Sequence, residues 1–85
     1  EPDMETFLGL PMAIQAAREG GSMPTVFNAA NELAVKKFLH EEIRFLDIYD
    51  IIGQSMERHK KTESPDLDEI LAVENETYQW IESRW

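Results

Sequence analysis

Three polar side chains stand close together in the most apolar stretch of the chain, PTVFNAANELAVKKFL at residues 24–39. Asn28 lies three residues before Asn31 and four before Glu32, so a helix would place all three on one face. They could form a polar site in a cleft, or the amides could hydrogen-bond the backbone of nearby loops, because buried polar groups need partners. Two amides supply neither a nucleophile nor a base with a shifted pKa, so the structural interpretation is favoured. Glu32 also stands four residues before Lys36, a spacing that favours an ion pair.

The two histidines, His40 and His59, are both expected near the end of a helix. A cationic imidazole is stabilised there by the helix dipole, and we favour this interpretation over metal binding. Neither histidine belongs to a zinc-protease HExxH motif or to the Glu-x-x-His pair of di-iron helical bundles. The sequence also contains no glycine-rich phosphate loop and no calcium loop of alternating aspartates. It therefore predicts that no catalytic, cofactor-binding or metal-binding residue lies in this chain.

The composition limits the class of protein. A chain of 85 residues, 42% of them hydrophobic, suffices for one domain with a single core. The net charge of −9 argues against nucleic acid or an anionic membrane as a partner. No apolar run approaches the roughly 20 residues of a membrane span, and no signal peptide is visible. The absence of cysteine excludes disulfides and thiolate chemistry and fits a reducing cytosol.

The central stretch is apolar on nearly all sides, which is typical of a helix buried among others. One broad arc carries Val26, Ala29, Ala30, Leu33, Ala34 and Phe38. Because alanines let neighbouring helices approach closely, residues 24–39 are expected to be the central helix. Ser22 should cap its start, with Pro24 in the first turn.

The preceding helix should start near Gly9 or Leu10, since Pro11 is tolerated only in a first turn. Its apolar stripe comprises Leu10, Ala13, Ile14 and Ala17. Residues 1–6 are expected to be extended, and Gly20-Gly21 should end the helix, because glycine adopts the left-handed conformation without strain.

The second half of the chain begins with a short extended link predicted at residues 41–45, whose Ile43 and Phe45 would hold onto the core. A third helix is predicted from Asp47 to His59. Its stripe comprises Ile48, Ile51, Ile52 and Met56.

The last helical region is expected to start at Ser64-Pro65, with serine as the cap. It carries two apolar stripes in different registers: Leu67, Ile70 and Leu71, then Tyr78, Ile81 and Trp85. Because the first register would bury Glu74, we predict a break or kink around Ala72–Glu74. The fold class is therefore all-α, a small antiparallel four-helix bundle in which residues 1–85 form a single domain.

Residues 27–48, FNAANELAVKKFLHEEIRFLDI, resemble the C-terminal helical domain of 1-deoxy-D-xylulose 5-phosphate reductoisomerase. The family pattern has an Asn-Ala-Ala-Asn-Glu run, an apolar helix and an Ile-x-Phe-x-Asp-Ile link. The corresponding residues here are Asn28, Ala29, Ala30, Asn31, Glu32, Phe38, Leu39, Ile43, Phe45, Asp47 and Ile48. The likeness extends to Pro2-Asp3, to Ala13, Ala16 and Gly20, and to PDLDEILAV at residues 65–73, so it covers essentially the whole chain. Two departures concern helix starts, since Pro11 replaces a proline usual near Leu8, and Leu46 stands where a capping threonine is frequent.

The resemblance implies a role in a larger enzyme. Reductoisomerases of this family convert 1-deoxy-D-xylulose 5-phosphate to 2-C-methyl-D-erythritol 4-phosphate, by a skeletal rearrangement and a reduction with NADPH. They need a divalent metal (Mg, Mn or Co), serve the non-mevalonate route to isoprenoids, and are typically homodimers. The resemblance places this enzyme in the bacterial cytoplasm.

The family's binding motifs lie in other domains. Its nucleotide site is in an N-terminal Rossmann-type domain, and its metal-binding acids, phosphate ligands and mobile lid are in the central catalytic domain. None of those motifs occurs in this chain, so no catalytic or binding residue is carried over. The implied role here is a helical domain packed against the catalytic domain of its own chain, inactive when isolated.

Two other classes of protein are alternatives. A stand-alone acidic helical protein-interaction module, using an apolar groove, is the main alternative. A small enzyme using Asn28, Asn31 and Glu32 is the least favoured. The chain begins at Glu1 without a methionine, so it is expected to be processed or a fragment. A fragment would expose the face its partner covers, and we expect self-association at high concentration.

Overall fold

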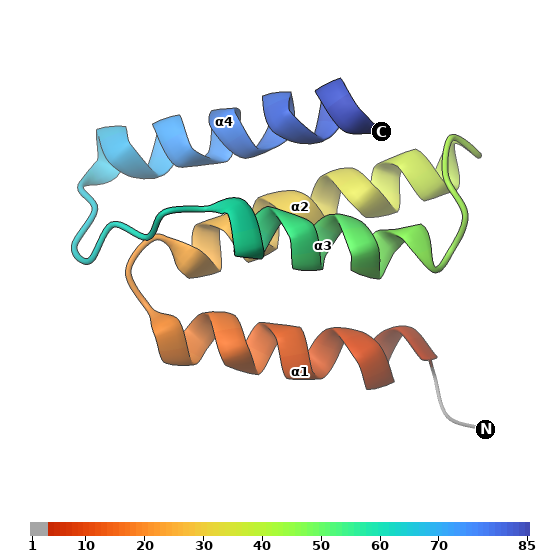
Figure 1. The fold of residues 1–85 in the computed structure, drawn as a ribbon, viewed down its shortest axis with the longest axis horizontal. Helices are drawn as coiled ribbons and strands as arrows, with labels where there is room; N and C mark the ends of the chain where they lie inside the picture. The colour runs from red at the N-terminus through yellow and green to blue at the C-terminus, as the bar shows by residue number, and fades with distance from the viewer. Residues whose placement is uncertain (1–3) are drawn as a thin grey trace.

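Helix α2 (Met23–Leu39) is the element against which the other three helices pack. The others are α1 (Met4–Glu19), α3 (Asp47–Arg58) and α4 (Leu67–Arg84). The computed structural model describes residues 4–85, with side chains from residue 10 onward, and within that range the all-α fold with four helices is confirmed. Successive helices run in alternating directions, and α1 and α4 lie on opposite sides of α2 and α3 (Figure 1).

The core is built around the small residues of α2. Val26, Ala30 and Ala34 are fully buried, which lets the neighbouring helices approach the backbone of α2 closely. The side chains that meet them come from every other helix: Ala16 of α1, Ile48, Ile51, Ile52 and Met56 of α3, and Ile81 of α4. The predicted central position of this helix and the predicted stripe of α3 are therefore confirmed.

The turn between α1 and α2 is formed by two glycines in the left-handed region, Gly20 at φ 66° and Gly21 at φ 56°. The Gly20 N–H donates to the Ala16 carbonyl at 3.0 Å, which closes the last turn of α1 as predicted. Directly after the turn, the Ser22 N–H donates to the Thr62 carbonyl in the α3–α4 loop at 2.8 Å. Two connections far apart in sequence are thus joined at one end of the molecule.

The predicted start and stripe of the first helix are wrong. Residues 4–6 already belong to α1, and Pro11 lies inside the helix rather than in its first turn; residues 1–3 lie outside the described part. Pro11 is exposed, so the hydrogen bond that proline cannot donate is missing on the solvent side, where water can replace it. Met12 and Ala16 face the core, while Leu10 and Ile14 are exposed.

The predicted break in the last helix is also wrong, because α4 is continuous from Leu67 to Arg84. Its buried side is formed by Val73, Thr77 and Ile81, whereas Leu67 and Leu71 are exposed, so only one register faces the core. Thr77 can occupy a core position because its hydroxyl donates to the Val73 carbonyl at 2.8 Å.

The capping of two helices, α4 and α2, differs from the prediction. The cap of α4 is Asp66 rather than Ser64: its carboxylate accepts from the Glu69 N–H at 2.8 Å, and the Glu69 carboxylate accepts from the Asp66 N–H at 3.2 Å. Ser22 does stand at the cap position of α2, but its hydroxyl makes no bond to that helix.

The link before α3 consists of turns and bends rather than the predicted extended segment, and Glu41 adopts a φ of 59°. Its predicted role is confirmed, because Ile43 and Phe45 pack against the core. The Phe45 ring meets Phe38 and Tyr49 edge to face, with centroids 5.6 and 5.8 Å away. This aromatic group holds the end of the molecule opposite the glycine turn.

The two glycines of the turn provide a matched test of the loop contact. Gly20→Ala should cost only the left-handed strain, about 1–2 kcal/mol, because a Cβ there has open space around it. Gly21→Ala should cost an additional ~1–3 kcal/mol, since its Cβ would overlap the backbone carbonyl of Thr62. Chemical denaturation of both variants measures the difference, and equal losses of stability would contradict the contact between these loops.

Candidate functional site

The face predicted from Asn28, Asn31 and Glu32 lies on α2 where that helix meets solvent. Asn28 and Glu32 are exposed and Asn31 is half-buried. Glu32 lines a cleft of about 260 Å³ between α2 and α4. Its other lining residues are Leu33, Lys36, Tyr78 and Glu82. The three residues therefore share a face without converging on a common point.

Glu32 pairs with α4 rather than with its own helix. The Tyr78 hydroxyl donates to the Glu32 carboxylate at 3.5 Å, and no ion pair joins Glu32 to Lys36 among the described residues, so that predicted pair is wrong. Burial, together with the negative charges of Glu74 and Glu32, raises the pKa of Tyr78, so the phenol remains a neutral donor. The contact joins α2 and α4, and it gives Glu32 a structural partner across the cleft.

Lys37 is a buried charge that the sequence pattern did not reveal. It is only 5% exposed, and its ammonium group forms ion pairs with Glu82 of α4 and, at 3.4 Å, with Glu42 of the following turn. The hydrogen bond to Glu82 raises the pKa of Lys37 despite the opposing effect of burial. A buried lysine can serve as a base or a Schiff-base amine only when its pKa is lowered, so this one is a structural cation.

A second polar group missed by the sequence analysis joins Ser22, His59 and Thr62. The Ser22 hydroxyl lies 2.7 Å from His59 Nε2 and accepts a hydrogen bond from the Thr62 N–H at 2.7 Å. Because that hydroxyl still carries its own proton, it can donate to a neutral imidazole. Burial lowers the pKa of His59, and the charge of Arg58 adds to this while Glu76 opposes it. The prediction that His59 is a cation at a helix end is therefore wrong.

The pair of Ser22 and His59 has the hydrogen-bond distance of a nucleophile and its base, but the serine is fully buried. No substrate could reach its hydroxyl, and within the described residues no carboxylate is hydrogen-bonded to the other imidazole nitrogen. The pair therefore acts as a tie between the α1–α2 turn and the α3–α4 loop.

His59 also lines a cleft of about 430 Å³ between α1 and α3. Its lining includes Met12, Met23 and Met56, together with polar groups most of which are paired. Gln15 donates to the Glu19 carboxylate at 3.0 Å, and Lys61 donates to the Glu19 carbonyl at 2.9 Å. These polar side chains are therefore engaged in contacts that hold the fold together.

The other histidine, His40, is exposed just after α2, with its Nδ1 3.9 Å from a Glu42 carboxylate oxygen. Within residues 4–85 no three His, Asp or Glu side chains are arranged to hold a metal ion. The same part of the chain contains no helix that is both long and apolar enough to cross a membrane.

Comparison with known proteins identifies the family of this chain. A family model described as the DXP reductoisomerase C-terminal domain matches residues 1–80. The chain belongs to this family. The 1-deoxy-D-xylulose 5-phosphate reductoisomerase of Agathobacter rectalis is 51% identical over 84 residues, which are 99% of this chain and 22% of that protein. The protein of the same name from Lachnoclostridium phytofermentans is 54% identical over 82 residues, 96% of this chain and 21% of that protein.

A more distant reductoisomerase, from Halalkalibacterium halodurans, is 46% identical over 81 residues, 95% of this chain and 21% of that protein. The reductoisomerase C-terminal domain described here thus spans about a fifth of the length of the relatives it matches. No solved structure matches the chain.

The partly buried imidazole of His59 should make the stability of this domain depend on pH. Because the pKa of His59 is lower in the folded than in the unfolded state, the unfolded chain binds more protons as the pH falls. The contribution of neutral His59 to the free energy of unfolding is therefore complete above about pH 6.5, the pKa of histidine in the unfolded chain. It is lost as the pH falls toward the lower pKa of the folded state. Denaturation between pH 7.5 and 5 measures this loss.

His59→Gln should flatten that pH dependence, since glutamine cannot take up the proton. His40→Gln is the control, because the imidazole of His40 is largely exposed, and it should follow the parent protein. If both variants kept the parent's slope, the tie between Ser22 and His59 would not govern the pH dependence.

Lys37 allows a second comparison. Glu82→Gln removes the negative charge from the first partner of a buried ammonium group and should cost about 1–3 kcal/mol of unfolding free energy. Glu42→Gln removes the longer contact and should cost less than about 1 kcal/mol. Urea denaturation at neutral pH distinguishes the two, and a larger loss for Glu42→Gln would show that Glu82 is not the main partner.

Proposed function

We propose that this chain is the structural C-terminal domain of a full-length 1-deoxy-D-xylulose 5-phosphate reductoisomerase. That enzyme would make 2-C-methyl-D-erythritol 4-phosphate with NADPH and a divalent metal, in the cytoplasmic non-mevalonate route to isoprenoids, as a homodimer. The observation that carries the proposal is the family match over residues 1–80, combined with relatives of which the chain spans about a fifth. Residues 1–85 are taken as one domain of that enzyme.

The described side chains support a structural rather than a chemical role. Two buried polar side chains, Lys37 and Ser22, connect elements that are distant in sequence: Lys37 pairs with Glu82 of α4, and Ser22 bonds to the partly buried His59. The residues of this chain do not fit the metal, since no three possible ligands come together in the described part. The metal and NADPH are therefore assigned to the rest of the enzyme.

The comparisons give no support to a stand-alone acidic interaction module, since the matched relatives are reductoisomerases about five times as long. The interpretation as a domain also accounts for the shared face of Asn28, Asn31 and Glu32. Those residues lie on the solvent side of α2, and Glu32 contacts Tyr78 across a shallow cleft.

The experiment compares the full-length gene product with the 85-residue chain. The full-length protein should oxidise NADPH on addition of 1-deoxy-D-xylulose 5-phosphate and a divalent metal. The isolated chain should show no turnover and no saturable NADPH binding in titration calorimetry. Glu32→Gln in the full-length protein should leave turnover within about twofold of the parent, since it removes only a surface contact. Saturable NADPH binding by the isolated chain would contradict the proposal.

A further inference from the structure

Helix α1 has two apolar sides, and only one of them is covered. Met12 and Ala16 face the core, Ala16 being fully buried. Leu10 and Ile14 are 56% and 44% exposed, and Ala17 is exposed as well. The spacing of these three residues, i, i+4 and i+7, places them on one stripe, opposite Met12 and Ala16. We call Leu10, Ile14 and Ala17 the outer face of α1.

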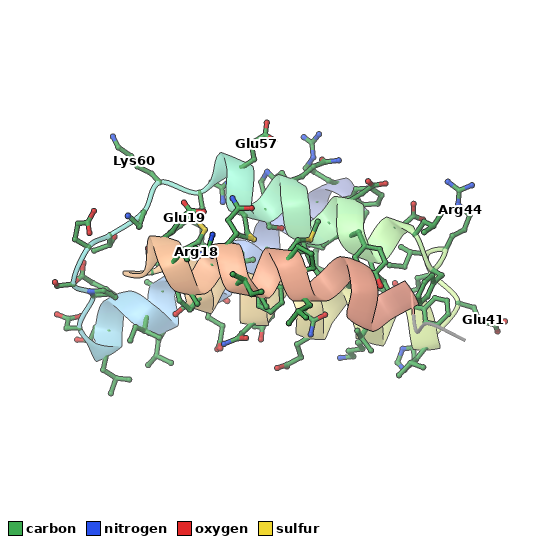
Figure 2. All side chains as sticks on the ribbon, turned by 90° about the horizontal axis from the view of Figure 1, so that it is seen from below. Arg18, Glu19, Glu41, Arg44, Glu57 and Lys60 are labelled. Atoms are coloured by element: carbon green, nitrogen blue, oxygen red, sulfur yellow. The ribbon has the colours of Figure 1, made fainter. Side chains whose placement is uncertain are left out.

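The outer face lies in a stretch without charge. No charged residue occurs from residue 7 to residue 17, in a chain of which 29% is charged. Figure 2 looks onto α1 from below, and the labelled charged side chains Arg18, Glu19, Glu57 and Lys60 gather toward one end of the helix, with Glu41 and Arg44 beyond the other. Depletion of charge at the centre, with a polar rim, is the usual composition of a protein interface.

The other exposed leucines that the structure describes have charged neighbours in sequence. Leu39 follows Lys36 and Lys37, and Leu46 lies between Arg44 and Asp47. Leu67 and Leu71 of α4 are exposed too, but Asp68 and Glu69 stand between them and Glu74 follows three residues after Leu71. Covering that surface would bring several carboxylates toward a low-dielectric interior, which costs free energy unless each finds a partner. The outer face of α1 can be covered without that cost.

On the basis of the proposed function, we propose that the outer face of α1 packs against the part of the reductoisomerase chain that precedes this domain. The family is a C-terminal domain and the chain spans about a fifth of its relatives, so most of the enzyme precedes α1. α1 is the first helix and lies at the edge of the fold, with α2 and α3 on its inner side (Figure 1). Its outer face is therefore the apolar surface nearest to the point where the rest of the enzyme joins.

Two substitutions in the full-length enzyme test this assignment. Ile14→Glu places a charge on the outer face of α1, and Leu71→Glu places the same charge on an apolar residue of α4 with comparable exposure, 53%. Because burying an unpaired carboxylate costs free energy, Ile14→Glu should detach the domain from the preceding part of the enzyme. Limited proteolysis in the segment before residue 1 should then become at least about tenfold faster. Leu71→Glu should stay within about twofold of the parent.

The same variants in the 85-residue chain control for unfolding. Both positions are exposed there, so each thermal midpoint should stay within about 4 °C of the parent. Ile14→Glu in the full-length protein should also raise hydrogen exchange of the α1 amides, a change that Leu71→Glu should not produce.

Any other outcome contradicts the assignment of the outer face of α1 to this interface. Equal proteolysis of the two variants, or a larger effect of Leu71→Glu, would show that α1 is not the covered face. If Ile14→Glu altered only the oligomeric state in light scattering, the occupant would be a second copy of the chain. NADPH-dependent turnover by the parent separates the two proposals: with turnover intact, these outcomes count against the α1 assignment alone, whereas a parent without turnover would refute the proposed function and with it the named occupant.

Discussion

The need to cover α2 on several sides determines the architecture of this domain. The buried residues Val26, Ala29, Ala30 and Ala34 occupy one broad arc of the helix, and the partly buried Phe27, Val35 and Phe38 extend the covered surface further round it. More than one neighbouring helix is therefore needed to shield α2 from water. The exposed positions Asn28, Glu32, Lys36 and Leu39 form one narrow stripe along the same helix. The polar face that suggested a site in the sequence is thus the side of α2 that meets solvent. Its composition follows from this position, and no chemical role is needed to explain it.

Local patterns predicted which residues form helices better than they predicted which sides are buried. The stripe of α3, with Ile48, Ile51 and Ile52, was predicted correctly because that helix has one apolar side. α1 and α4 each have an additional apolar surface, at Leu10 and Ile14 and at Leu67 and Leu71, which faces outward. Periodicity cannot distinguish an apolar side that packs within a domain from one that does not.

Buried polar residues misled the prediction in a second way, because the local sequence pattern does not show that they lie in the core. Thr77 is buried in α4 because its hydroxyl bonds the backbone one turn earlier, so the register that includes Ile81 continues without a break. Lys37 is buried because Glu82 approaches it from a helix distant in sequence. The bonds of Ser22 to His59 and Thr62 likewise span about 40 residues, and no local spacing predicts them. The resemblance to the reductoisomerase family, and not the physics of any site, predicted the function.

The two ends of the domain are held by different interactions. At the glycine turn, the Gly20 N–H bonds within α1, Lys61 donates to the Glu19 carbonyl, and Ser22 joins the α3–α4 loop. At the opposite end, the aromatic contacts of Phe45 and the ion pairs of Lys37 connect α2 with α3, α4 and the intervening turn. From residue 10 onward, α1 is covered on one side only, and its outer apolar face needs a further surface to shield it from water. In a C-terminal domain, the chain that leads into α1 is in the right place to supply it.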